Sequence, residues 1–212
     1  MKHDQAISLF NKPKIISLIA DVNQGKSMFL YNLIKNIKQN HTFKLYVYGL
    51  REDIPGAQRV ESIAEIESIS NSIIIADEFG SLFDLDNRKV KAIIENSLRL
   101  INHKNNVLII AGVPENFKKF ISGKTDVFIF KKTSLADLIN GSRAKEMVMS
   151  YKGKERGSAV LDIPLNQALV YDGKHYALWD VPYLAQYDTK KDNQPILTPK
   201  KRIVKTEVVL WN

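Results

Sequence analysis

The sequence predicts an α/β fold in which a mostly parallel central sheet is flanked by helices. The first observation is a series of short hydrophobic runs that are apolar on both faces, which is typical of strands in a buried parallel sheet. The second is that amphipathic helical patterns lie between these runs, and such alternation favours βαβ units. The third is the length of 212 residues, which is enough for one substantial domain with an appendage.

The hydrophobic runs predicted to form the core strands are Lys14–Ala20, Phe43–Leu50, Ser72–Ala76, Val107–Val113 and Val127–Phe130. A first helical pattern places on one face Phe29, Leu30, Leu33, Ile34 and Ile37. A second one does the same with Val90, Ile93, Ile94, Leu98 and Ile101. Asp86 or Asn87 is predicted to cap this second helix, and Pro114 to begin a short helix after the fourth strand.

The C-terminal third differs in character from the rest of the chain. We expect residues 1–155 to form the core, 156–187 a small β-rich appendage of the same domain, and 188–212 a basic arm. The appendage is predicted to contain a hairpin with Asp172-Gly173 as its turn. The arm carries the basic cluster Lys200, Lys201, Arg202 and Lys205.

The composition is that of an ordinary soluble protein with a basic balance. The sequence contains no cysteine, which excludes disulfides and cysteine-based zinc sites. The hydrophobic runs are too short to span a membrane, so we expect a cytoplasmic protein, in a host cell or associated with a virion. The net charge of +8 favours a polyanionic partner such as nucleic acid.

The segment "ADVNQGKS" has the features of a phosphate-binding loop. Gly25, Lys26 and Ser27 follow an apolar strand and open an amphipathic helix, which is the context that this motif requires. Ala20 stands where the first glycine of the loop is expected, and alanine fits there only if its φ angle is negative. The residues predicted to contact nucleotide are Asp21, Val22, Asn23, Gln24, Gly25, Lys26, Ser27 and Met28.

Two acidic residues, Asp77 and Glu78, directly follow the strand predicted at Ser72–Ala76. Open α/β sheets bind ligands at the carboxyl edge of their parallel strands, so these carboxylates are expected near the phosphate loop. In P-loop nucleotidases, an aspartate at the end of such a strand completes the Mg²⁺ shell, and an adjacent glutamate can polarise the attacking water. The two motifs together indicate a P-loop NTPase of the additional-strand class.

These motifs, with Arg99 in "SLRLINHKNN" and the strands "VLIIAGV" and "TDVFIF", resemble the FtsK/HerA superfamily of DNA-pumping ATPases. The compact size is similar to that of tectivirus-type genome-packaging ATPases, and Zot-type phage morphogenesis ATPases share a similar acidic strand. The resemblance covers Lys14 to about Lys132. It implies a RecA-like sheet in the order 5-1-4-3-2, a homo-oligomeric ring, and double-stranded DNA moved at the expense of ATP.

The resemblance also implies a role for individual residues. Lys26 would hold the β- and γ-phosphates of ATP, Ser27 and Asp77 would hold Mg²⁺, and Glu78 would activate water. Asn23, Gln24 and Gly25 would offer backbone N–H groups. Many members carry a polar sensor at the end of the fourth strand; here Gly112 stands at that end and Asn116 follows it.

A ring ATPase needs a positive charge from the neighbouring subunit at the transition state. Arg99 is the first choice for this role, Arg143 the second and Arg88 the third. Contacts with DNA would be independent of base sequence, because they would go to the phosphates. The candidates for them are Lys118, Lys119, Lys124, Lys152, Lys154 and Arg156.

The sequence thus predicts an ATPase that packages a viral genome as double-stranded DNA into a preformed capsid, with a capsid or vertex protein as a further partner. A DNA loader or partitioning ATPase would use the same motifs without pumping DNA. A morphogenesis protein that binds nucleotide as a switch and anchors a partner through its arm is the alternative from another class. A nucleotide kinase is disfavoured, because only Arg143 falls where an arginine-rich lid is expected.

Overall fold

The computed structural model describes residues 9–40, 43–50, 53–79, 85–133 and 163–182. Within these residues eight strands form one sheet. The strands are β1 (Lys14–Ile19), β2 (Lys44–Tyr48), β3 (Ala57–Arg59), β4 (Ser72–Ala76), β5 (Val107–Gly112), β6 (Val127–Phe130), β7 (Gln167–Tyr171) and β8 (Tyr176–Asp180). The helices are α2 (Lys26–Asn40), α3 (Ile63–Ile66), α4 (Arg88–His103), α5 (Lys119–Ser122) and the 3-10 turn η1 (Pro114–Asn116).

The strand order is β3-β2-β4-β5-β1-β6-β7-β8. All pairs from β3 to β6 are parallel, whereas β6–β7 and β7–β8 are antiparallel. Numbered by themselves, the five predicted core strands run in the order 5-1-4-3-2. The mostly parallel α/β fold with flanking helices that the sequence predicts is therefore confirmed, together with the sheet order implied by the resemblance.

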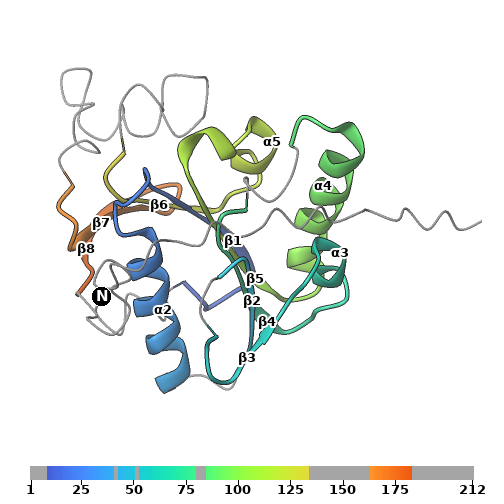
Figure 1. Ribbon diagram of the computed structural model, residues 1–212, viewed down its shortest axis with the longest axis horizontal. Helices are drawn as coiled ribbons and strands as arrows, with labels where there is room; N and C mark the ends of the chain where they lie inside the picture. Colours follow the sequence, from blue (N-terminus) through green and yellow to red (C-terminus); the bar gives the residue numbers. More distant parts are fainter. Residues whose placement is uncertain (1–8, 41–42, 51–52, 80–84, 134–162, 183–212) are drawn as a thin grey trace, which may run out of the picture.

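The central sheet carries helices on both faces (Figure 1). On one face α2 packs Phe29, Leu33 and Ile37 against alternate strand residues such as Ile16 and Leu18. On the other face α4 packs Ile94, Leu98 and Ile101 against the intervening strand residues, among them Ile15 and Ile19. Because successive strand residues point to opposite faces, a strand that is covered on both faces must be largely apolar. This is why β1, β4, β5 and β6, which are buried along their whole length, appear in the sequence as hydrophobic runs with few polar residues.

The ends of the elements agree closely with the prediction. Strands β4 and β6 have the predicted bounds, and the other core strands are shorter by one to three residues. Asn87 is the N-cap of α4, because its side chain accepts hydrogen bonds from the backbone N–H groups of Lys89 and Val90. Asp86 does not cap this helix but forms an ion pair with Lys118.

The predicted hairpin forms β7 and β8 and continues the main sheet beyond β6. The Asp172 carboxylate accepts hydrogen bonds from the N–H groups of Lys174 and His175, and Gly173 has a φ angle of +94°, as its turn position requires. The edge strand β3 and the one-turn helices α3 and α5 were not predicted, because elements of three or four residues carry no clear periodicity. The basic arm, 188–212, lies outside the described residues, as does much of 156–187.

Among the described residues no helix is both long and apolar enough to cross a membrane.

Candidate phosphate-binding site

The segment from Ala20 to Lys26 forms a loop between β1 and α2 and is attached to both strands beside β1. The Ala20 N–H donates to the Gly112 carbonyl at the end of β5, at 3.2 Å, and the Asp21 N–H donates to the Lys132 carbonyl after β6, at 3.2 Å. The loop then turns through left-handed conformations at Asn23 (φ 62°) and Gly25 (φ 78°). Alternation of this kind turns backbone N–H groups toward one concavity, which is how phosphate loops bind anions.

Ala20 fits its position without strain. Its φ angle is not positive, and it is fully buried while it continues the pairing of β1 with β5. The condition under which alanine can replace the first glycine of the loop is therefore met. The left-handed conformations fall on Asn23 and Gly25 instead, and both residue types adopt them readily.

The start of α2 faces this concavity. The first N–H groups of a helix have no partner within the helix, so those of Lys26, Ser27 and Met28 are oriented for an anion. Besides the N–H groups of Ala20 and Asp21, that of Gln24 is also used, because it donates to the Asp21 carbonyl at 3.3 Å. Val22, at 71% exposure, stands out from the loop into solvent.

Lys26, Asp77 and Glu78 meet at the carboxyl edge of the sheet. Lys26 Nζ lies 2.6 Å from Glu78 Oε1 and 3.7 Å from Asp77 Oδ1. The Lys26 and Asp77 side chains are buried, at 9% and 8% exposure, whereas that of Glu78 is 45% exposed. The structure thus brings together the lysine of the phosphate loop and both acidic residues predicted from the sequence.

Both the backbone and the side chain of Asp77 form hydrogen bonds with backbone groups. Its N–H donates to the Tyr48 carbonyl of β2, and its Oδ1 accepts from the Glu78 N–H at 2.9 Å. Burial raises the pKa of Asp77, against the opposing effect of the nearby Lys26 ammonium. A buried carboxylate that is costly to ionise gains most from a cation beside it.

Glu78 has a left-handed backbone, with φ at +53°. A residue with a side chain adopts this conformation at a cost of about 1–2 kcal/mol, and such residues cluster at functional sites. The turn is fixed on its far side by Phe79, whose N–H donates to the Ala111 carbonyl of β5. This conformation allows the Glu78 side chain to reach Lys26.

The residues present fit a nucleotide with Mg²⁺. Ser27 is exposed at the start of α2, and the buried Asp77 carboxylate lies near the same end of the loop through its contact with Lys26. Mg²⁺ is usually held by one or two protein oxygens together with waters and substrate phosphates. Accordingly, a dense cluster of acidic or histidine ligands is not needed, and the described residues contain none.

Two of the arginines predicted to act on a neighbouring subunit lie on α4, at different distances from the carboxyl edge of the sheet. Arg88 is the first residue of α4, at the edge of the sheet where the site lies, and it is exposed. Arg99 is also exposed, but it lies about 16 Å further along the helix, toward the edge where the parallel strands begin. Arg143 is outside the described residues.

A polar group returns to the end of β5 although Gly112 itself has no side chain. After β5 the chain forms the 3-10 turn η1, and Asn116 folds back over the strand end. A Cβ atom on Gly112 would lie 3.5 Å from Asn116 Nδ2. Asn116 is therefore at the place where the resemblance implies a sensor.

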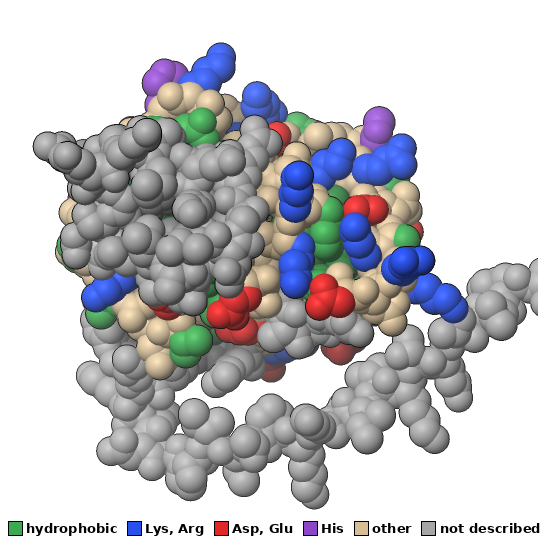
Figure 2. All heavy atoms as spheres, turned by 90° about the horizontal axis from the view of Figure 1, so that it is seen from above, with side chains coloured by type: hydrophobic (Ala, Val, Ile, Leu, Met, Phe, Trp, Pro, Cys, Tyr) green, Lys and Arg blue, Asp and Glu red, His purple; other side chains and the backbone are tan. Residues whose placement is uncertain are grey.

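Lysines predicted to contact DNA are exposed where the structure describes them. Lys118, Lys119 and Lys124 lie in or beside α5. Seen from above, Lys and Arg side chains gather on the side of α4 and α5, with some Asp and Glu between them (Figure 2). Lys152, Lys154 and Arg156 lie outside the described residues.

Lys131 was missed by the sequence reasoning. It directly follows β6, its side chain is fully buried, and its Nζ lies close to the phosphate loop at Gly25. The only signal in the sequence is a lysine that ends an apolar strand, "VFIFKK", and that pattern is usually a solvated strand end.

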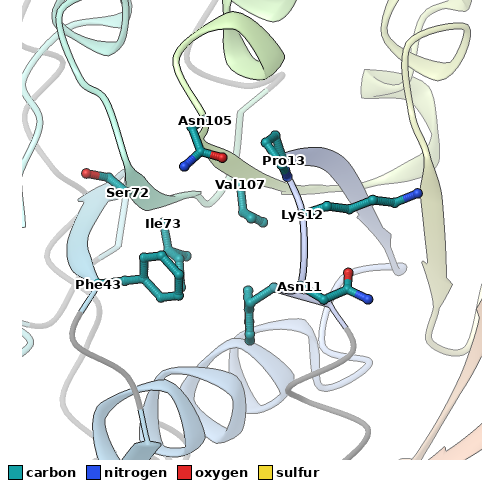
Figure 3. A pocket seen from close by; sticks show the side chains of 9 residues that line it. Asn11, Lys12, Pro13, Phe43, Ser72, Ile73, Asn105 and Val107 are labelled. Atoms are coloured by element: carbon teal, nitrogen blue, oxygen red, sulfur yellow. The ribbon is translucent and has the colours of Figure 1, made fainter.

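A separate cavity of about 220 Å³ lies at the opposite edge of the sheet (Figure 3). It is lined by residues that precede or begin β1, β2, β4 and β5, among them Pro13, Phe43, Ser72 and Val107. Parallel sheets bind ligands at the other edge. This cavity is therefore distinct from the phosphate loop and does not form part of the site.

The strand order and the loop between β1 and α2 are those of a P-loop NTPase fold. No protein-family model matches the sequence, and no curated protein matches it. Solved structures do share the fold. The genome packaging NTPase B204 of Sulfolobus turreted icosahedral virus 2 superposes with a TM-score of 0.58 at 16% identity, over 82% of this chain and 98% of that one.

The B204 DNA-packaging ATPase of Sulfolobus turreted icosahedral virus gives a TM-score of 0.60 at 16% identity, over 80% of this chain and 98% of that one. The cytoplasmic domain of the type VII secretion ATPase EccC from Thermomonospora curvata gives 0.56 at 11% identity, over 81% of this chain and 24% of that one. The chain thus shares the fold of viral genome-packaging ATPases, as the resemblance found in the sequence implies.

Proposed function

We propose that this protein is an ATPase of the FtsK/HerA type that translocates double-stranded DNA and packages a viral genome into a preformed capsid. The observation that carries the ATPase part is the meeting of Lys26, Asp77 and Glu78 beside the loop at the end of β1. The packaging part is supported by the structural neighbours, which include two B204 genome-packaging enzymes matched over 98% of their length.

Each residue of the site has a separate task in this proposal. The backbone of Asp21–Met28 surrounds the phosphates, and the Lys26 ammonium neutralises their outer charge. Ser27 and Asp77 would hold Mg²⁺, which would supply charge stabilisation to the transferring phosphoryl group. Glu78 accepts a proton from the attacking water, for which its partly exposed carboxylate is suited.

The Lys26–Glu78 ion pair must open before both residues can act. When phosphates occupy the loop, they compete with Glu78 for the Lys26 ammonium, and the carboxylate becomes available to water. At a distance of 2.6 Å, the lysine proposed to bind phosphate holds the carboxylate proposed to accept the proton.

The proposal extends to the assembly. Subunits form a homo-oligomeric ring in which an arginine from one subunit acts at the site of the next, with Arg99, Arg143 and Arg88 as the candidates. Lys118, Lys119 and Lys124 contact DNA phosphates, and their exposed positions support this role. The protein acts in the host cytoplasm, at the vertex of the capsid.

ATP hydrolysis by the full chain, measured with linear duplexes of increasing length, tests this proposal. We expect double-stranded DNA to accelerate turnover, with ATP consumption that increases with duplex length, because a translocase consumes ATP in proportion to the distance travelled. Lys26→Ala is the control and should abolish turnover. Hydrolysis that is independent of DNA would overturn translocation and favour a nucleotide-switched assembly protein.

A loader or partitioning ATPase would be stimulated by DNA to an extent that does not depend on length. Hydrolysis that survives Lys26→Ala would overturn the ATPase assignment itself, because the loop would then not be the catalytic site.

A further inference from the structure

Lys131 has a buried ammonium group that contacts no acidic side chain among the described residues. Its side chain is fully buried, and its Nζ donates hydrogen bonds to the carbonyls of Leu165, at 2.5 Å, and Gln167, at 2.7 Å. Both carbonyls belong to the segment that enters β7. No carboxylate within the described residues forms an ion pair with it, so the charge is solvated by two backbone dipoles.

This ammonium lies directly behind the phosphate loop. A Cβ atom on Gly25 would lie 3.3 Å from Lys131 Cε and 3.6 Å from its Nζ. The same Cβ would lie 3.6 Å from the Leu165 carbonyl oxygen. Lys131 and Leu165 therefore lie close to Gly25, the loop residue just before Lys26. The Lys131 backbone N–H donates to the Ile19 carbonyl of β1.

A lone buried ammonium is costly, because it loses its hydration without gaining a counter-charge. Burial lowers the pKa of Lys131 to about 8. Charged side chains on the surrounding elements are Asp21 and Lys26 on the loop, Lys132 next in sequence, and Asp180 on β8, which Gln167 contacts. An anion bound in the phosphate loop would supply a counter-charge.

We infer that Lys131 is a positioning residue of the phosphate site, whose buried ammonium joins the β7 segment to the back of the loop and provides positive charge to phosphates bound in front. The inference rests on the proposed function in one respect, namely that the loop binds nucleotide phosphates. It adds a second lysine to that site and gives the β7–β8 hairpin a role in phosphate binding. The alternative is that Lys131 only satisfies two buried carbonyls.

The test is the affinity of the full-length protein for ATP and for inorganic triphosphate, in wild type, Lys131→Met and Lys132→Met. Methionine retains the length and apolar stem of lysine without its charge. Lys132→Met is the matched control, because it makes the same charge change at the next residue, whose side chain is exposed.

We expect Lys131→Met to lower the affinity for both ATP and triphosphate about 10-fold at pH 7, because a partly shielded positive charge near the phosphates is lost. Lys132→Met should change these affinities less than about 2-fold. The wild-type affinity should fall between pH 7 and pH 9.5 toward that of Lys131→Met, as the ammonium loses its proton. A folded Lys131→Met with wild-type affinity, or with the same pH dependence as wild type, would overturn the inference.

Circular dichroism shows whether Lys131→Met folds. If it does not fold, the inference is tested by the proton uptake that accompanies ATP binding. This uptake is measured for wild type and Lys132→Met by calorimetry at pH 8 in buffers of different ionisation enthalpy. Bound phosphates should raise the fraction of Lys131 that is protonated. ATP itself contributes little to the uptake, because its last phosphate pKa is about 6 and it is already ionised at pH 8. We expect uptake of a fraction of a proton in both proteins, and its absence would overturn the inference.

The two proposals fail in different ways. If wild type binds neither ATP nor triphosphate, the proposed function and the role of Lys131 are both overturned. If wild type binds both and Lys131→Met is unaffected, only the role of Lys131 is overturned.

Discussion

Lys26 Nζ lies 2.6 Å from Glu78 Oε1 although the two residues are 52 positions apart in the chain. The lysine begins α2 and the glutamate follows β4, and the two meet because β5 and β1 bring the ends of β4 and the phosphate loop to one edge. The residue expected to bind phosphate and the residue expected to activate water are thus ion-pair partners.

Glu78→Gln should separate binding from turnover. Without the carboxylate, Lys26 is released for phosphate, so we expect ATP to bind about 3- to 10-fold more tightly, the equivalent of an ion pair of ~1 kcal/mol. Turnover should fall at least about 100-fold, because the general base is lost. Titration with a fluorescent ATP analogue and release of inorganic phosphate measure the two effects. Weaker binding by this variant would contradict the ion-pair argument; Lys26→Met, as the control, should lose binding.

Asp77→Asn should lower Mg²⁺-dependent turnover about 100-fold or more, because a ligand carboxylate is removed. The same change should raise the free energy of unfolding at pH 7. The folded-state pKa of Asp77 lies above its unfolded value, so its contribution to stability is present at low pH and is lost as the pH rises through the folded-state pKa.

The neutral asparagine keeps the contact with the Glu78 N–H and has no charge to desolvate. The gain in stability should therefore disappear below about pH 3, where the wild-type carboxyl is mostly protonated in both states. Urea unfolding of both proteins at about pH 3 and pH 7 checks this. A variant less stable than wild type at pH 7 would mean that attraction to Lys26 outweighs the cost of burial.

Gly25→Ala should impair the phosphate loop. At a φ angle of 78° a side chain costs about 1–2 kcal/mol, and the new Cβ would approach Lys131 Cε to 3.3 Å. We expect ATP affinity to fall about 10-fold or more, because the loop must shift to accommodate the methyl group. Gly173→Ala is the control: its φ angle is +94°, but nothing lies within 4 Å, so it should lose stability and keep ATP affinity. Equal ATP binding by the two variants would contradict this prediction.

Asn116→Ala tests whether the amide beside Gly112 acts at the site. A polar group that orients water or phosphate contributes to the transition state rather than to binding, so we expect turnover to fall about 10- to 100-fold with little change in ATP affinity. Measurements of steady-state turnover and of equilibrium ATP binding together distinguish a contribution to the transition state from a contribution to binding. Unchanged turnover would remove Asn116 from the site.

Asn106→Ala should destabilise the fold by about 2–4 kcal/mol, because it leaves two buried backbone groups without partners. The Asn106 side chain accepts from the Ser72 N–H and donates to the Ile69 carbonyl, and it is 1% exposed. Chemical denaturation measures the loss. Asn102→Ala, on the exposed face of α4, should change stability by less than about 0.5 kcal/mol. A similar small effect at Asn106 would contradict the prediction.

Much of the fold could be predicted because its signals are local. The parallel strands are buried on both faces and therefore appear as continuous apolar runs, as in Ser72–Ala76, whose bounds the structure confirms. The turn at Asp172-Gly173 was predictable from two residues. The elements missed, β3, α3 and α5, are single turns or three-residue pairings that depend on their neighbours.

The sequence by itself determined the phosphate loop, because an apolar strand, a glycine, a lysine and the start of a helix are contiguous in the chain. It also determined that Asp77 and Glu78 follow a buried strand. Only the tertiary structure decided which distant side chains share the site. Glu78 reaches Lys26, Asn116 returns to Gly112, and Lys131 lies buried behind Gly25, because β5 and β6 pair on either side of β1. Such contacts depend on strand order, and strand order depends on packing over the whole sheet rather than on any single segment.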